Sequence, residues 1–285
     1  MLVCCRIQSK ERTHAHKALT VVIRTHLLTL VRCSPLPIIG VVVVVVHRTT
    51  LVTDHGIIEI LLDTECLHSH CRITCLILNN LSIPFDNKQA MVRSDRLLNA
   101  LLTTIHPLPE ETYLVCICLM NLSFWQESHS RLLHYCPTPP NIPLENPKSL
   151  LRIIESIMLT YVPLLSQTTK LSVEGEAVRW TTGLLRNLVS EQQTHHHAKL
   201  IAETKLPRCL LSCLRDSHKP LSQWKRDTLE DLALQIVLNL AKWPESSKQL
   251  QHLKAQSYLE HIEGQGGIHD VRVSWIRCSL ESLSS

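Results

Sequence analysis

Strongly apolar segments alternate with polar connections along the chain, and one kind of segment recurs. Four copies close on Asn-Leu followed by Ser, Ala or Val, and a fifth, degenerate copy has Ser-Leu in that place. The copies are TCLILNNLS (74–82), YLVCICLMNLSF (113–124), WTTGLLRNLVS (180–190), LALQIVLNLAKW (232–243) and VSWIRCSLESLSS (273–285). Their marker residues, Asn80, Asn121, Asn187, Asn239 and Ser282, are 41, 66, 52 and 43 positions apart. A period near 42 with two insertions predicts a helical solenoid.

A second apolar segment precedes each of the four Asn markers. These segments are GIIEILL (56–62), RLLNALLTTI (96–105), SLLRIIESIMLTYVPLL (149–165) and LPRCLLSCLRDS (206–217). Their apolar residues at i, i+3, i+4 and i+7 predict helices that bury one face. A pair of such helices cannot bury its apolar surface alone, so neighbouring pairs must stack. The longest interval contains CPTPPNIPLENP (136–147), whose five prolines predict a loop.

Composition narrows the class of protein. The chain has 285 residues, 45% of them apolar, which suffices for a buried core, and only 7 glycines, which disfavours phosphate-binding loops and most all-β folds. Most of its 12 cysteines lie in apolar runs (Cys75, Cys116, Cys118, Cys209, Cys213 and Cys278), and we expect them to be reduced core residues. No secretory signal is visible, and the apolar run 33–46 is shorter than the roughly 20 residues that span a membrane. We therefore expect a protein of the cytoplasm, the nucleus or both.

The first 47 residues differ from the rest. Residues 1–32 carry six basic side chains and one acid, whereas the remaining 253 residues are nearly neutral. Residues 18–31 show the pattern of an amphipathic helix with a basic flank. We interpret 1–47 as a capping helix or a wrongly assigned gene start, with a mitochondrial presequence as the alternative. Residues 48–285 form the predicted repeat domain.

With these repeated segments the chain resembles the armadillo-repeat family. The resemblance is clearest in DHGIIEILLDTECLHSHCRITCLILNNLSIPFDNKQAMV (54–92), which has the Gly-hydrophobic-hydrophobic start, the Leu-rich second helix and the Asn-Leu-Ser ending of such a repeat. It extends over about 48–285 as five repeats, the third irregular. It implies an all-α, right-handed α-solenoid of about five armadillo-like repeats. It also implies that the third helix of each repeat lines a concave groove, where Asn side chains can bind the backbone of an extended peptide.

The candidate binding residues follow from this register. The ladder is Asn80, Asn121, Asn187 and Asn239, because a carboxamide offers a peptide unit both donors and an acceptor. The alternative is that each Asn bonds to its own helix backbone. Positions four and eight before each Asn share its face and supply Arg72, Tyr113, Arg179 and Gln235 as groove candidates. Trp180 and Arg186 join them because Arg and Trp frequently anchor interfaces, and Arg179, Trp180 and Arg186 form the favoured hot spot.

Other functions find little support. Importin alpha carries Trp four residues before its Asn, where this chain has Leu76, Ile117, Gly183 and Gln235. Cys and His cluster within 66–75, but without the C-x2-C spacing of zinc knuckles, so we expect no metal and no other cofactor. No nucleotide-binding or serine-hydrolase motif occurs, so we expect no enzyme and no small-molecule substrate.

The predicted function is a non-catalytic scaffold that holds an extended segment of a partner protein. Two alternatives stay open. One is an organelle-targeted helical-repeat protein that binds RNA, suggested by the basic N-terminus, although the neutral repeat region makes nucleic acid an unfavourable partner. The other is a structural part of a larger assembly, because the fifth marker lies at the end of the sequence and the last helices could expose apolar surface.

Overall fold

The computed structural model describes residues 58, 61–62, 71–104, 109–136, 149–165, 172–190, 195–214, 223–260, 262 and 268–282. Throughout these ranges the regular structure is helical and no strand occurs. None of the helices within them is long and apolar enough to cross a lipid bilayer. The chain divides into two compact units, 1–100 and 101–285.

The helices keep their order along the chain. The first unit contains α6 (Cys71–Leu81) and α7 (Phe85–Arg93), and α8 (Asp95–Thr104) begins there. The second unit contains α9 (Pro109–Leu122), α10 (Ser128–His134), α11 (Leu150–Tyr161) with the 3-10 turn η1 (Val162–Leu164), α12 (Val173–Leu188), α13 (His195–Ala202), α14 (Leu206–Cys213), α15 (Gln223–Ala241), α16 (Pro244–His252), α17 (Ala255–Leu259) and α18 (Ile268–Glu281).

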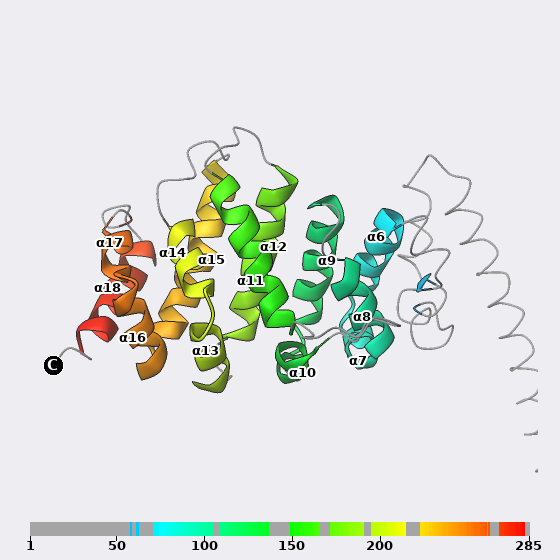
Figure 1. Ribbon diagram of the computed structural model, residues 1–285, viewed down its shortest axis with the longest axis horizontal. Helices are drawn as coiled ribbons and strands as arrows, with labels where there is room; N and C mark the ends of the chain where they lie inside the picture. Colours follow the sequence, from blue (N-terminus) through cyan, green and yellow to red (C-terminus); the bar gives the residue numbers. More distant parts are fainter. Residues whose placement is uncertain are drawn as a thin grey trace, which may run out of the picture. The chain divides into compact units, whose positions relative to one another are not determined.

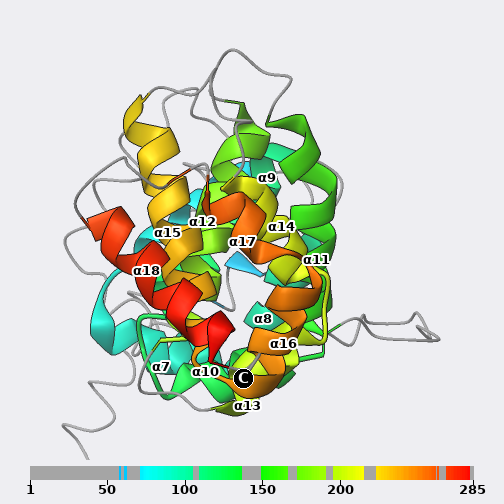
Figure 2. The same cartoon turned by 90° about the vertical axis from the view of Figure 1, so that its left-hand side faces the viewer.

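The second unit is built from consecutive groups of three helices (Figure 1). Each group has a short first helix, a second helix and a longer third helix: α10–α11–α12, α13–α14–α15 and α16–α17–α18. Equivalent helices stack on one another, so that α9, α12, α15 and α18 form one row. Viewed along the rows, α11, α14 and α17 form a second row beside it, and α10, α13 and α16 lie at the lower edge (Figure 2). This is the stacked architecture of a solenoid.

The predicted helices are found where they were expected. The five marker segments lie on α6, α9, α12, α15 and α18, and three of the second segments lie on α8, α11 and α14. The apolar pattern alone indicated two helices per repeat, and the structure adds the short first helix of the three-helix repeat that the armadillo resemblance implies. These first helices have seven to nine residues and a polar composition, so their apolar periodicity is weak. The segment 1–47, its boundary at 48 and loop residues 137–148 lie outside the described residues.

Third helices of the second unit pack against one another, and α12 and α15 each have such a neighbour on both flanks. α9 is apolar almost all round and packs against α12, with the Thr181 hydroxyl donating to the Cys116 sulfur at 3.2 Å. Gly183 faces Met120 so closely that a Cβ atom there would lie 3.4 Å from the Met120 Cγ. A helix that contacts a neighbour on each side keeps only a narrow stripe for solvent.

Side chains of the short first helices cap the third helices. The last carbonyl groups of a helix have no partner within the helix. Lys88 Nζ donates to the carbonyl of Ser82 at 2.6 Å, and His129 Nε2 donates to that of Ser123 at 2.7 Å. The same function is performed by Asn87 toward Leu81, Ser128 toward Leu122 and His197 toward Leu188. Four of these five side chains stand six positions after the residue whose carbonyl they bind, and His197 stands nine positions after Leu188.

Glu155 joins two second helices. It is 8% exposed on α11, and its Oε1 accepts the backbone N–H of Lys205 at 2.6 Å, directly before α14. Its Oε2 pairs with Arg152 at 2.8 Å. Burial alone would raise the pKa of Glu155, but the hydrogen bonds from Arg152 and Lys205 outweigh it and hold the pKa below its ordinary value. The charged carboxylate therefore fixes the start of α14.

Replacing Glu155 with Ala should lower the free energy of unfolding by about 2 kcal/mol, because the backbone N–H of Lys205 loses a charged, buried acceptor. Arg152→Ala is the matched control and should cost within about 0.5 kcal/mol, since the Arg152 side chain is 53% exposed. Urea unfolding followed by circular dichroism measures both. Equal losses in the two variants would contradict this role for Glu155.

Stability should fall as the pH decreases below the ordinary histidine pKa of 6.5. Burial lowers the pKa of His129 and of His197, so protons bind the unfolded chain before they bind the folded one. The Nδ1 atom of His129 is buried without a hydrogen-bond partner in the described part, so a proton there would be unsatisfied. Thermal melts from about pH 7.5 to about pH 5.5 measure the effect. His129→Gln should flatten the dependence, exposed His252→Gln should not, and an unchanged slope in His129→Gln would contradict the assignment.

Candidate functional site

A stripe of half-exposed side chains runs along α9 and α15, whereas on α12 Gly183 and Asn187 of the same register are buried and only Arg179 is half-exposed. On α9 it contains Tyr113, Ile117 and Asn121, and on α15 it contains Asp231, Gln235 and Asn239. The positions between them are mostly buried. These residues stand eight, four and zero positions before the marker, the register that the sequence predicts. We call the exposed positions of α9, α12, α15 and α18 in this register the third-helix stripe.

Two of the three predicted hot-spot residues on α12, Arg179 and Trp180, are in contact. The Arg179 guanidinium lies over the Trp180 ring, 4.2 Å from its centre, and donates twice to Glu176 Oε2 at 3.0 and 3.2 Å. The Arg179 side chain is only 15% exposed, and Trp180 is half-buried. The three side chains form a preorganised cation–π and ion-pair cluster, in which the positive charge is balanced locally.

The side chain of Asn187 is buried in the contact between α12 and the end of α9. It is 7% exposed, and its Nδ2 donates to the Ser123 hydroxyl at 2.8 Å and to the Met120 carbonyl at 3.4 Å. Arg186 donates to its Oδ1 at 2.8 and 3.2 Å. The amide of Asn187 therefore joins α12 to the end of α9, and Arg186 holds it there.

The other Asn markers have different surroundings. Asn80 is half-buried on α6 and donates to the carbonyl of Leu76 at 2.9 Å, as the helix-backbone alternative expects. Asn239 is half-buried and makes no side-chain hydrogen bond to the part of the chain that the structure describes. Gln235, one turn earlier, donates to Asp231 at 2.7 Å, and Asp231 also pairs with Arg272 of α18. Asn239 thus offers a partner an uncommitted amide.

Arg72 and Asn80 belong to the first unit. Arg72 is exposed near the start of α6, two turns before Asn80. The two residues share one face of that helix, as the register requires.

The buried thiols are poor nucleophiles. Cys75, Cys116, Cys118, Cys209 and Cys213 are buried as expected, whereas the expectation for Cys278 was wrong, because it is exposed on α18. Burial raises the pKa of Cys116 to about 12 and that of Cys209 to about 11, and it also raises that of Cys213. Such thiols remain protonated at neutral pH and serve as small apolar residues.

Metal ligands are not assembled in the described ranges, where no group of three or more His, Cys, Asp or Glu side chains could hold an ion. The Cys/His cluster of 66–75 lies largely outside these ranges.

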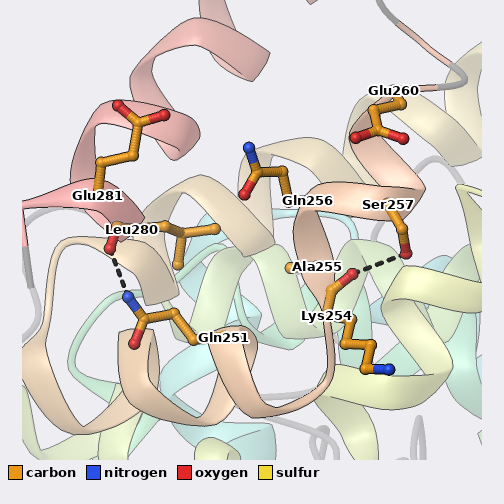
Figure 3. A pocket seen from close by; sticks show the side chains of 8 residues that line it. All are labelled: Gln251, Lys254, Ala255, Gln256, Ser257, Glu260, Leu280 and Glu281. Carbon is orange, nitrogen blue, oxygen red and sulfur yellow. Dashed lines mark hydrogen bonds between the residues drawn. The ribbon is translucent and has the colours of Figure 1, made fainter. Parts of the chain in front are cut away.

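A cavity of about 550 Å³ opens between α16, α17 and the end of α18 (Figure 3). The Gln251 amide donates to the Leu280 carbonyl, and the Ser257 hydroxyl donates to the Lys254 carbonyl at 2.9 Å. Charged side chains of both signs, Lys254, Glu260 and Glu281, contribute to the lining. Among the described residues of this lining there is no Cys or His.

Comparison with known proteins identifies the fold. No protein-family model matches the sequence, and no curated protein matches it. A solved structure described as "A conserved phosphorylation switch controls the interaction between cadherin and beta-catenin in vitro and in vivo" contains a similar chain, with a TM-score of 0.65 over 92% of the present chain. The fold is an armadillo-like α-solenoid. The sequences are 13% identical and the match covers 54% of that other chain, so the likeness concerns the fold alone.

Two features of the site were not predicted. The buried caps Lys88 and His129 each follow their marker Asn by eight positions, which is the signal that could have revealed them, whereas His197 follows Asn187 by ten positions. Trp275 is exposed on α18, seven positions before Ser282, and stands in the same register as Trp180. That shared register was visible in the sequence.

Replacing Asn187 with Ala should lower the free energy of unfolding by about 1 to 3 kcal/mol, because Ser123 and Met120 lose a buried donor. Asn239→Ala should change it by less than about 0.5 kcal/mol, since no bond of the described fold depends on that side chain. Chemical denaturation of both variants makes the comparison. A stable Asn187→Ala variant would contradict the joining role.

Proposed function

We propose that this protein is a non-catalytic interaction scaffold whose third-helix stripe binds an extended segment of a partner protein. The observation that carries the proposal is that the position eight residues before the marker is half-exposed on three helices that stack in series, as Tyr113 of α9, Arg179 of α12 and Asp231 of α15. An extended segment laid across these helices would meet Tyr113, then Arg179 with the adjacent Trp180, and then Gln235 and Asn239 of α15.

The chemistry of the stripe suits a peptide backbone. Asn239 supplies an amide that can donate to a carbonyl and accept from an N–H, and Asn121 stands at the equivalent place on α9. Trp180 and Tyr113 supply partly buried aromatic surface, which frequently anchors interfaces. The internally bonded Asn187 would then support the surface as a structural link, while its neighbours make the contacts.

The structural likeness adds support from the fold. The matching structure concerns the interaction between cadherin and beta-catenin, two proteins that engage each other. Armadillo-like folds are generally non-catalytic, and repeat solenoids present long binding surfaces. The buried thiols fit a reducing compartment, so we place the protein in the cytoplasm or the nucleus.

The proposal predicts a partner that depends on the stripe. Tyr113→Ala, Gln235→Ala and Asn239→Ala, combined in the full chain, should reduce partner recovery from native extract at least tenfold. A matched control combines Lys199→Ala and Arg208→Ala, which are exposed on α13 and α14 away from the third helices. Quantitative mass spectrometry of the recovered proteins measures the effect, after circular dichroism shows that both variants remain folded.

The stripe would be rejected as the binding surface if the control variant lost the partner and the stripe variant retained it. RNA recovered with the wild type and lost on nuclease treatment would favour the nucleic-acid alternative. Trp180→Ala alone should weaken the same interaction by about 2 kcal/mol if Trp180 is an anchor.

A further inference from the structure

Two first helices, α10 and α13, are joined by histidines at the lower edge of the second unit (Figure 2). His134 at the end of α10 and His196 near the start of α13 are exposed, and their rings stack with 5.4 Å between the ring centres and 27° between the ring planes. His129 of α10 and His197 of α13 are buried, with 3% and 4% of their surface exposed. We call these four residues the histidine joint.

The buried histidines of the joint bind the ends of two third helices. His129 Nε2 donates to the Ser123 carbonyl at 2.7 Å, directly after α9, and His197 Nδ1 donates to the Leu188 carbonyl at 3.1 Å, at the end of α12. The Ser123 hydroxyl also accepts the amide of Asn187 from α12. The histidine joint is therefore continuous with the contact between α9 and α12.

Protons act against this joint. One proton on His134 and another on His196 put two positive charges on rings whose centres are 5.4 Å apart. Burial lowers the pKa of His129 by more than nearby Glu127 raises it. Burial also lowers the pKa of His197, and the other three histidines of the joint lower it further. A group that binds a proton more weakly in the closed joint than in water favours opening as the pH falls.

The charged groups described on the helices around the joint do not offset this repulsion. Arg131 of α10 and Lys199 of α13 each stand one turn from the stacked rings, so they add positive charge. Glu155 of the adjoining α11 is bonded to the backbone N–H of Lys205. Glu203 stands about two turns from the stacked rings, beyond the end of α13. A protonated joint thus has more positive than negative charge around it.

The next contact along the same edge responds to protons in the opposite direction. His195, also on α13, bonds to Glu245 at the start of α16 with 2.7 Å between Nε2 and Oε2, and its ring centre lies 5.3 Å from that of Trp243. A protonated imidazole strengthens both contacts, as an ion pair with the carboxylate and as a cation beside the indole. Both members of the pair are about half exposed, so water reduces this gain without reversing it.

We propose that the histidine joint is a pH-sensitive switch, in which protonation separates α10 from α13 while α13 is held more firmly against α16. The proposal goes beyond the scaffold function and does not depend on it. The opening falls between the groups α10–α11–α12 and α13–α14–α15, where α9 and α12 end. Because opening takes up more than one proton, its free energy changes more steeply with pH than it would for a single histidine.

Hydrogen–deuterium exchange of the full chain, followed by mass spectrometry, tests the switch at about pH 7.5 and about pH 5.5. The rates are corrected for the intrinsic pH dependence of amide exchange. Peptides from α10 and α13 should exchange about tenfold faster at the lower pH, because one pKa unit of difference between the closed and open forms shifts their equilibrium tenfold per proton. Peptides from α15 and α16 should keep their corrected rates.

Three variants separate the two contacts. His134→Phe combined with His196→Phe keeps two rings in contact and removes their protons, so it should abolish most of the acceleration in α10 and α13. His252→Gln, at an exposed histidine of α16 outside the joint, is the matched control and should leave the acceleration intact. His195→Gln should add α16 to the helices that exchange faster at the lower pH, because the protonated link to Glu245 is lost.

Equal acceleration in all helices of the second unit would overturn the proposal, because it would indicate global unfolding. Unchanged rates in α10 and α13, or full acceleration in the variant of His134 and His196, would also overturn it. If α16 exchanged no faster in His195→Gln, the hold of α13 on α16 would be rejected. Each of these results leaves the proposed function standing.

Discussion

The packing of third helices against one another is the constraint on which the rest of the second unit depends. The contact between α9 and α12 shows it most clearly, because Gly183 packs against Met120 and the Thr181–Cys116 and Asn187–Ser123 bonds join the two helices. In α12 and α15 this stacking takes up both flanks, and a third side faces the second helices α11 and α14. A partner can therefore reach one narrow stripe of side chains on each third helix, and these stripes recur from one third helix to the next.

The same packing explains why polar residues are buried beside the core. Stacked third helices end in the interior, where their last carbonyls would lack water, so the next short helix supplies Lys88 or His129 as a donor. At the start of α14, the Glu155 carboxylate accepts the backbone N–H of Lys205 and so satisfies a donor at the beginning of a helix. Each of these side chains belongs to one element and completes another, which couples neighbouring groups of helices. Where the cap is a histidine, as at His129, the coupling between neighbouring groups of helices depends on pH.

The periodic sequence predicted the solenoid and the register of its exposed faces, because both follow from helical geometry and apolar spacing. It could not separate Asn187 from Asn239, which end equivalent segments. The difference comes from neighbours in space: Ser123 and Arg186 engage the amide of Asn187, whereas the described fold makes no use of that of Asn239. The first helices were missed because they are short and polar. Cys278 was misassigned because it lies in an apolar run of the sequence, yet its position four residues before Ser282 faces solvent on α18.

The central claim is that partners contact the third-helix stripe, and site-specific photo-crosslinking tests it most directly. A benzophenone side chain placed at Gln235 reports on the stripe, and one at exposed Lys248 of α16 reports on a surface away from it. Irradiation of the full chain in native extract should join a protein partner to the Gln235 position and not to the Lys248 position. A partner joined at Lys248 and absent from Gln235 would contradict the account.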